Sequence, residues 1–422
     1  MIQRLSILAA YIFMTCLVAA NAQATSSEVQ IKALTLDDAV QRALTHNPDL
    51  QALRLEEGSA KGQNERARLL LINNPTLEGN VSKKDRPAAE GGGKFTNYGF
   101  KLSQELEIAG QRGDRVDVAE KELARVKLEI ADKERILVAD VKDAFTRLLS
   151  LKRKSSLAQE IVSLQEELLG FTKIRFQAGD ISGLDVNLSE VELSKAKKEL
   201  LLAQREYRES LLVLQGLIGL SPDMSFSVEG ELPSEASALP DRETLRSLAF
   251  SRRPDSKASA FEIGKAESAL ELAKKEAFPN ITLSGFYERD ENRNVAGLEI
   301  SVPLPFFDRK QAEKKEALAK AEGAKMKAAG LKMTIEREID QAFNDLSSAI
   351  EELSLFRSEI LVKAAENLSL LNLAFKEGKI GFFEVRIAQK DTIEAQFAYI
   401  ETQTRTQLAL NAIEKITGGK VK

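Results

Sequence analysis

A long stretch without glycine or proline constrains the fold of this chain more than any other feature. No glycine occurs between Gly113 and Gly170, and no proline occurs from Ala88 to Ser221. The stretch consists mainly of Ala, Leu, Glu, Lys, Arg and Gln, which lose little side-chain freedom in a helix. Its apolar residues recur three or four positions apart. We therefore expect one helix over about residues 110–176, roughly 90–100 Å long, which needs other helices packed along its side.

Alternating apolar and polar residues precede this helix and predict two strands. The expected elements of this part are short helices at about 36–44 and 48–71, strands at about 76–84 and 97–106, the long helix, and a return helix at about 185–217. The residues that share one face of the second strand are Tyr98, Phe100, Leu102 and Leu106. The segment Asp85–Lys94, with three consecutive glycines, is expected to be a flexible loop.

The same order of elements then occurs a second time. Pro279 corresponds to Pro75, and Arg253-Pro254-Asp255 corresponds to Asn47-Pro48-Asp49. The elements expected in this second unit are a helix to about residue 277, strands at about 280–288 and 296–304, a long helix at about 309–375 and a return helix at about 384–416. We divide the mature chain into a first repeat (23–220), a linker (221–240) and a second repeat (241–422).

The N-terminus is typical of a secretory signal peptide, which we assign to residues 1–22. Arg4 supplies the positive start, Leu5–Val18 is largely apolar, and Ala20-Asn21-Ala22 fits a cleavage site of small residues. A membrane anchor is the alternative, although the apolar run is short for a spanning helix. The only cysteine, Cys16, would leave with the signal peptide, and lipid attachment to it is the other possibility that remains open.

Residue content gives little support to an enzyme or a nucleic-acid-binding protein. Lys and Arg total 60 against 64 Asp and Glu, so the charge balance gives no reason to expect nucleic acid. The single histidine, His46, lies where a helix end is expected, and no cysteine or second histidine could complete a dyad or a metal site. Gly91–Lys94 resembles a phosphate loop only superficially, because Phe95 stands where Ser or Thr is required. We expect no catalytic residue, no metal site and no cofactor.

The four predicted strands have the length that a tilted barrel needs to cross a bilayer. Four strands cannot close a barrel, because the smallest known barrels have about eight, and open edges are not tolerated in lipid. We therefore expect several chains to contribute strands to one shared barrel, with the long helices continuing its wall as a helical tube. The alternative is a small water-soluble sheet that caps a coiled-coil stalk.

Three segments of the sequence resemble one known family. Gln104–Arg112 follows the first strand pair, Val302–Arg309 follows the second, and Arg175–Val186 resembles the helix-turn tip of that family. With these segments and this order of elements, the chain resembles the TolC-like outer-membrane factor family. It is more closely similar to the CzcC-like branch, which is associated with heavy-metal efflux. The resemblance covers nearly all of the mature chain, in both repeats.

The resemblance implies a mainly α fold with a small β part. Three chains with four strands each would form a trimeric 12-stranded β-barrel in the outer membrane, continued by an α-helical barrel in the periplasm. It also implies contact with outer-membrane lipid and docking onto a periplasmic adaptor (a membrane fusion protein) and an inner-membrane pump, often a proton-driven one. The implied function is passive conduction of substrate, heavy-metal cations in this branch, to the exterior. A soluble periplasmic coiled-coil adaptor or scaffold is the alternative.

The turns Phe176–Gly183 and Phe375–Phe382 are the candidate docking and gating sites. Both turns reverse long helices roughly 100 Å from the strands, which puts them toward the inner membrane. A glycine permits each reversal, and the apolar residues around it exceed what a solvated turn requires. The residues that we assign to adaptor docking are Phe176, Gly179, Ile181, Phe375, Gly378 and Ile380.

Two acidic residues occupy equivalent places just after the turns and are the candidate charges at the tunnel entrance. They are Asp185 and Glu384. The Glu384 position resembles one that carries an acidic ring in the family, although the second acidic place of that ring, one turn on, is Ile387 here. A mature chain with one histidine and no cysteine cannot select soft metals by coordination. We therefore assign selectivity to the pump, and the sequence alone names no ion.

Overall fold

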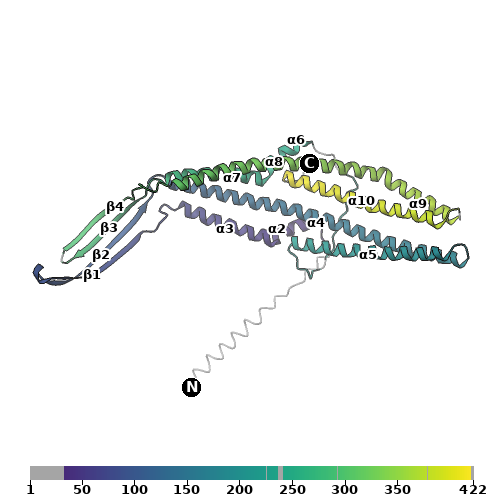
Figure 1. The fold of residues 1–422 in the computed structure, drawn as a ribbon, viewed down its shortest axis with the longest axis horizontal. Coiled ribbons are helices and arrows are strands. Elements are labelled where there is room, and N and C mark those ends of the chain that lie inside the picture. The colour runs from purple at the N-terminus through teal and green to yellow at the C-terminus, as the bar shows by residue number, and fades with distance from the viewer. Residues whose placement is uncertain (1–32, 225, 236–240, 292, 378, 420–422) are drawn as a thin grey trace, which may run out of the picture.

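The computed structural model describes residues 33–224, 226–235, 241–291, 293–377 and 379–419. The expected signal peptide, Cys16 and Gly378 lie outside the described residues. The described part is mainly helical, with one small sheet at one end of an elongated molecule (Figure 1). Among its helices, none combines the length and the apolar character that a membrane-spanning helix requires.

The first repeat forms two short helices, a strand pair and two long helices. Its elements are α2 (Leu36–His46), α3 (Pro48–Arg68), β1 (Thr76–Arg86), a short 3-10 turn η1 (Ala88–Glu90), β2 (Gly93–Leu106), α4 (Gln111–Gln177) and α5 (Gly183–Leu217). Helix α4 has 67 residues and is therefore about 100 Å long. Strand pairing continues to Arg86 and Gly93. The prediction of a flexible loop over Asp85–Lys94 is therefore wrong at both ends, because backbone pairing extends into it.

The second repeat has the same order of elements, with three differences from the expectation. Its elements are α6 (Arg242–Arg252), α7 (Pro254–Lys275), β3 (Ile281–Asp290), β4 (Arg293–Ser301), α8 (Gln311–Leu355), a π-helical turn η2 (Phe356–Ile360), α9 (Leu361–Lys376) and α10 (Phe382–Thr417). Helix α6 was not expected. The expected strand end at residue 304 is wrong, because β4 ends at Ser301. Pro303 and Pro305, which follow it, lack the N–H that pairing with another strand requires. The long helix of this repeat is interrupted by the wider η2 turn.

In both repeats the chain passes from strand to long helix through the same local backbone conformation and hydrogen bond. The residue before each helix has a left-handed backbone, with φ of 77° at Gly110 and 57° at Lys310. The first helical residue is a glutamine in both repeats. The Gln111 side-chain oxygen accepts a hydrogen bond from the Ala109 N–H at 2.9 Å, and that of Gln311 accepts one from Arg309 at 2.8 Å. The internal repeat is thus visible in hydrogen bonds as well as in the order of elements.

The four strands form one antiparallel sheet in the order β1-β2-β3-β4. Strand β2 of the first repeat pairs with β3 of the second, with Phe100 opposite Tyr287. Strands β1 and β4 pair on one side only among the described residues, so they are the two edges of the sheet. The sheet is therefore shared by the repeats and remains open.

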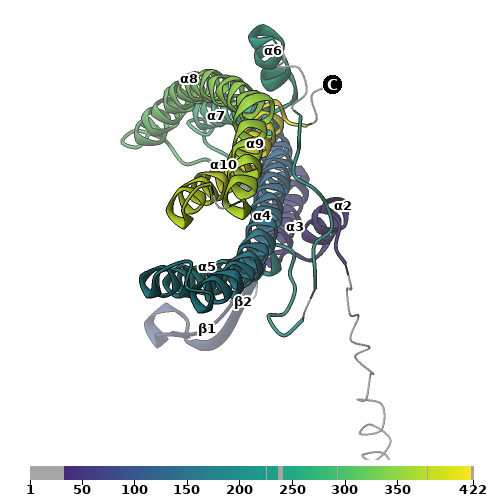
Figure 2. The ribbon, with the colours of Figure 1, turned by 90° about the vertical axis from the view of Figure 1, so that its right-hand side faces the viewer.

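The long helices form a curved wall, seen from the turns in Figure 2. Helix α4 packs against α3 and α7 in the half near the sheet, and against α5 and α10 in the half near the turns (Figure 1). Helices α2 and α6 lie on the convex side of the wall. Beneath α2 a core includes Leu50, Val141, Leu148 and Leu214, all with fully buried side chains. A second core beneath α6 includes Leu245, Ile335 and Leu346.

Ion pairs join the two repeats where α4 packs on α7. Glu122 of α4 binds Lys265 of α7 at 3.0 Å, and Arg125 of α4 lies 3.2 Å from Glu262 of α7. Glu122 also binds Arg125 at 2.7 Å. The hydrogen bond from Arg125, aided by Lys265, holds the pKa of Glu122 at about 2 despite its partial burial, against 4.5 for a free glutamate.

We expect the Glu122→Gln variant to lose stability at neutral pH by about 1–3 kcal/mol, because Glu122 bridges two cations in a partly buried site. The pKa is lower in the folded state, so the stabilisation is complete above about pH 4.5 and is lost as the pH falls toward 2. Urea unfolding followed by circular dichroism should show a wild-type-to-variant difference at pH 7 that shrinks near pH 3. The matched control is Glu120→Gln, which removes an exposed pair with Arg68 and should cost less than about 1 kcal/mol at either pH.

Candidate functional site

One face of the sheet is an exposed apolar surface. Because directly paired residues share a face, the register places the apolar residues of all four strands together. We call this surface the apolar face; its large members are Leu77, Val81, Tyr98, Phe100, Leu102, Leu283, Tyr287, Leu298 and Ile300. Leu298, near the middle, is 82% exposed. Apolar surface of this extent on a sheet is typical of an interaction with lipid or protein.

The opposite face of the sheet is polar. Lys101 of β2 binds Glu299 of β4 at 2.9 Å across β3. The Ser284 hydroxyl donates a hydrogen bond to that of Ser103 at 3.0 Å. Glu78 and Glu288 lie on this face too, around a depression of about 400 Å³. The sheet thus separates a polar side from an apolar side, as the alternating sequence predicted for β2.

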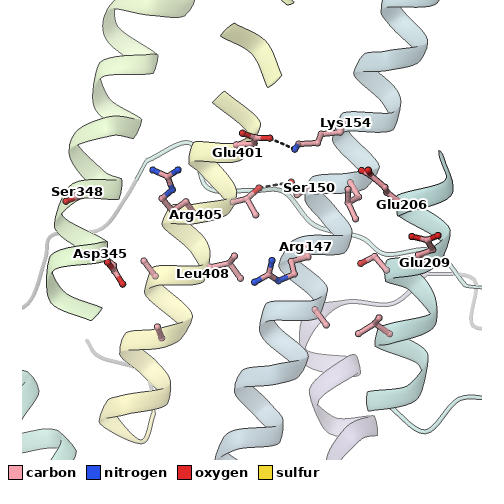
Figure 3. A pocket seen from close by; sticks show the side chains of 17 residues that line it. Arg147, Ser150, Lys154, Glu206, Glu209, Asp345, Ser348, Glu401, Arg405 and Leu408 are labelled. Carbon is pink, nitrogen blue, oxygen red and sulfur yellow. Dashed lines mark hydrogen bonds and ion pairs between the residues drawn. The ribbon is translucent and has the colours of Figure 1, made fainter. Parts of the chain in front are cut away.

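The curved wall carries a groove near its middle that charged and apolar side chains line, which the sequence analysis did not predict. Its volume is about 1030 Å³, and α4, α5, α8 and α10 line it (Figure 3). The charged residues in it are Arg147, Lys154, Glu206, Glu209, Asp345, Glu401 and Arg405. Lys154 binds Glu401 at 2.7 Å, and Thr404 donates a hydrogen bond to Ser150 at 2.7 Å. The only sequence signal for this groove was the density of charge on the helices, which is equally typical of any solvated face.

Polar contacts also join α4 to α10 beside the groove. The Asn411 amide donates a hydrogen bond to Asp143 at 2.9 Å, and Lys142 pairs with Glu414. Burial raises the pKa of Asp143, while the hydrogen bond from Asn411 opposes that change. The second repeat therefore meets the first through polar groups here, whereas each repeat has its own apolar core.

The first turn closes α4 with a Schellman arrangement of hydrogen bonds. The Asp180 N–H donates to the Arg175 carbonyl at 2.9 Å and the Gly179 N–H to that of Phe176 at 3.0 Å, with φ of 80° at Gly179. A Cβ added at Gly179 would meet no atom within 4 Å. The glycine is thus required by backbone conformation and not by crowding.

Exposed apolar side chains gather at the first turn, as the sequence predicted. They are Phe171, Ile174, Phe176 and Leu184. Ile181, which we also assigned to docking, is only half-buried and therefore presents less surface than expected. The prediction missed Phe171 and Ile174, although their apolar character next to the turn is visible in the sequence.

The second turn has the same backbone hydrogen bonds where it is described. The Lys379 N–H donates to the Ala374 carbonyl at 2.9 Å, in the place of the Asp180 bond of the first turn. Phe375 lies in α9, and Ile380 is half-buried. The exposed apolar residues near this turn are Leu370, Leu373, Phe383 and Ile387. Both turns, which lie at the end of the wall away from the sheet, thus present apolar surface.

The two candidate charges differ in their surroundings. The Asp185 carboxylate accepts hydrogen bonds from the Ser182 backbone N–H at 3.0 Å and from its hydroxyl at 2.8 Å, as in a capping box at the start of α5. Glu384 is exposed in the first turn of α10 and extends over Gly381. Asp185 therefore has a structural partner that the sequence analysis overlooked, although the serine three residues before it was a visible signal.

Histidine and the other candidate ligand residues do not converge in the described residues, where no group of three or more could hold a metal ion. His46 is exposed at the end of α2, and its Nδ1 lies 2.6 Å from the Thr45 hydroxyl. This contact fits the expected helix-end role.

Comparisons with known proteins identify relatives over nearly the whole chain. The family model described as outer membrane efflux protein matches residues 39–220 and 245–419. The cobalt-zinc-cadmium resistance protein CzcC of Cupriavidus metallidurans is 25% identical over 392 residues, which cover 91% of this chain and 90% of that protein. The pyoverdine export outer membrane protein OpmQ of Pseudomonas aeruginosa is 24% identical over 406 residues, 91% of this chain and 85% of that protein.

A solved structure of the outer-membrane channel OprN has the same fold. It superposes with a TM-score of 0.78 and 20% sequence identity, and the match covers 95% of both chains. The arrangement of a small sheet and a wall of long helices is therefore that of a known channel protein.

Proposed function

Because the chain belongs to the outer membrane efflux protein family, we propose that it is the channel subunit of a tripartite efflux system. In this role it conducts substrate passively from an inner-membrane pump and a periplasmic adaptor to the exterior. The family is located in the outer membrane and consists of efflux channels, not enzymes. The observation that carries the proposal is the single sheet with one apolar and one polar face, joined directly to a curved wall of helices.

The open sheet supports a homotrimer. Within the part of the chain that the structure describes, β1 and β4 each have one unpaired edge, which lipid does not tolerate. Three copies would pair β4 of one chain with β1 of the next and close a 12-stranded barrel, within the size range of known barrels. The apolar face would then contact outer-membrane lipid, and the polar face would line the lumen. The helical wall, with charged residues in its groove, would continue the lumen into the periplasm.

Membrane fractionation together with planar-bilayer recording tests the proposal. We expect the mature protein in the outer-membrane fraction, and we expect purified trimers to conduct ions across a lipid bilayer. Recovery of the protein in the soluble periplasm without detergent would favour the alternative, a coiled-coil adaptor, and would overturn the channel.

For the cargo, we propose heavy-metal cations, with selectivity located in the pump. The support is the similarity to CzcC, a cobalt-zinc-cadmium resistance protein, whereas the relative OpmQ is a pyoverdine export protein. Deletion of the gene should sensitise the cell to cobalt, zinc or cadmium. Sensitisation to organic compounds alone would contradict a metal cargo.

We also propose that the two turns dock the adaptor and gate the tunnel. The support is the exposed apolar surface at both, including Phe176 and Phe383. Among the assigned docking residues, Gly378 lies outside the described residues. In this proposal Glu384, which is exposed, contributes charge at the entrance, and Asp185 chiefly caps α5.

The Gly179→Val variant should retain its trimer and lose adaptor-dependent efflux. A β-branched residue with a φ of 80° strains the turn by about 1–2 kcal/mol, and the strain stays local because no atom lies near the added Cβ. Efflux in a complemented deletion strain and trimer recovery in detergent measure the two effects. Gly179→Asn, which tolerates this conformation, and Gly170→Ala, in open space on α4, are matched controls. Normal efflux by Gly179→Val would show that the first turn only reverses the chain.

A further inference from the structure

We propose that Lys83 and Arg289, at the outer end of the apolar face, bind phosphate groups of lipids in the outer leaflet of the membrane. The inference rests on the proposed channel, in which the apolar face contacts lipid. The ligand class is a phosphorylated glycolipid, whose phosphates lie at the level where the hydrocarbon ends. With Lys94, these residues make up what we call the cationic rim.

The strand register puts the rim on the same face as the apolar residues. Val81, Tyr98 and Arg289 lie side by side in one row across β1, β2 and β3. The next row outward on that face pairs Lys83 with Thr96, and the row beyond pairs Asp85 with Lys94. All three cations lie near the two hairpins, at the end of the sheet away from the helices (Figure 1). Toward the outer end of this face, aliphatic side chains are followed by tyrosine and then by cations. Proteins show the same order where they pass from the hydrocarbon of a membrane into its headgroups.

Two cations of the rim, Lys83 and Arg289, have no anionic partner within the described part of the chain. Among the described residues, Lys83 and Arg289 make no ion pair, and Lys94 approaches Asp85 only at 3.9 Å, with both side chains largely exposed. The neighbouring carboxylate of Glu291 is already bound by Lys84, at 3.0 Å, and by Arg86. Lys83 is exposed and Arg289 is half-buried, and both lie at the border of an apolar surface. Each can therefore bind an anion from another molecule.

A second copy of the chain would not supply that anion. In the proposed trimer, β1 pairs with β4 of the neighbouring chain. The residues of β4 on the apolar face are Asn294, Ala296, Leu298 and Ile300, none of which is acidic. The acidic residue of β4, Glu299, lies on the polar face and binds Lys101. The partner that remains is the lipid itself.

The spacing of the cations fits a headgroup with more than one phosphate. Lys83 and Arg289 lie on strands separated by one intervening strand and are offset by one row, or two residues, along the strands, which places their backbones roughly 12 Å apart. Both side chains are long and can reach toward each other or toward separate phosphates. Arginine and lysine are the residues that bind phosphate most strongly.

Lipid retention by purified trimers tests the inference. The wild-type protein, Lys83→Gln/Arg289→Gln and the control Arg293→Gln are reconstituted in phosphatidylcholine vesicles with or without a minor fraction of diphosphoryl lipid A. Arg293 is an exposed cation of the same hairpin end on the polar face, opposite Asp290. Lipid A bound per trimer after detergent extraction is measured by native mass spectrometry. We expect the double variant to retain at least about ten-fold less lipid A than the other two, from roughly five-fold per cation.

Equal retention by all three proteins would overturn the inference and leave the channel intact. Displacement of lipid A by an equimolar amount of inorganic phosphate would also overturn it, since the site would then be for a free anion. Failure of the wild-type protein to insert into either kind of vesicle would overturn the proposed function as well, so the two failures are distinguishable.

Discussion

Replacement of Leu298 by arginine is expected to prevent stable insertion of the protein into the outer membrane. Leu298 is 82% exposed and lies in a central row of the apolar face, between Gly285 and the open edge. An arginine on the lipid-facing side near the bilayer midplane costs about 2–4 kcal/mol, and the closed trimer would contain three of them. We expect trimer yield in the outer-membrane fraction to fall at least about ten-fold.

The matched control for this variant is Val295→Arg. Val295 is an exposed apolar residue of the same strand, but its neighbour in the register, Glu288, lies on the polar face. An arginine there would point into the proposed lumen, where water can solvate it, so insertion should be nearly normal. The assay is heat-modifiable trimer on gels of isolated outer membranes. If Leu298→Arg and Val295→Arg inserted equally well, the assignment of the two faces would be wrong.

Replacement of Gly219 by alanine is expected to produce the largest loss of stability in the helical part. Gly219 follows α5 with a φ of 64°, a conformation that costs a residue with a Cβ about 1–2 kcal/mol. The added Cβ would also lie 2.4 Å from the backbone oxygen of His46 at the end of α2, which cannot move without displacing that helix. From the strained backbone conformation and the steric clash together, we expect a loss of about 3 kcal/mol or more in the free energy of unfolding.

Two other glycines make this prediction specific. Gly216, one turn earlier in α5, has no atom within 4 Å of an added Cβ, so Gly216→Ala should leave stability unchanged or raise it by up to about 1 kcal/mol. Gly418 occupies the corresponding place after α10, with a φ of 74° and a distance of 3.1 Å to the Arg252 side chain. Gly418→Ala should therefore have an intermediate effect. Urea unfolding in detergent, followed by circular dichroism, measures all three; a Gly219→Ala protein as stable as Gly216→Ala would contradict the contact with His46.

Much of the architecture could be predicted because it depends on local patterns. The absence of glycine and proline between Gly113 and Gly170 predicted a helix as long as α4, since propensity acts residue by residue. The two-residue alternation in β2 predicted which side chains share a face, because that period is a property of any strand. The glycine at position 179 marked the first turn for the same local reason. Even the family resemblance rests on short segments such as Val302–Arg309.

The features that the sequence did not predict depend on contacts between distant residues. The π turn at Phe356–Ile360 has no glycine or proline to mark it. The groove around Arg147 exists only because α4 and α10, which are far apart in the chain, lie side by side (Figure 3). Nothing local distinguished a charge in that groove from a charge on a solvated face.

The sequence by itself therefore determined the elements of this protein: their lengths, their repetition and the alternation of their faces. Only the tertiary structure decided that β2 pairs with β3 across the repeats, that Gly219 lies against His46, and that Lys83 and Arg289 lie at the same end of the apolar face. The physical reason is that secondary structure follows from interactions within a few residues, whereas a site requires side chains from several elements. Their arrangement is selected by packing and pairing over the whole chain.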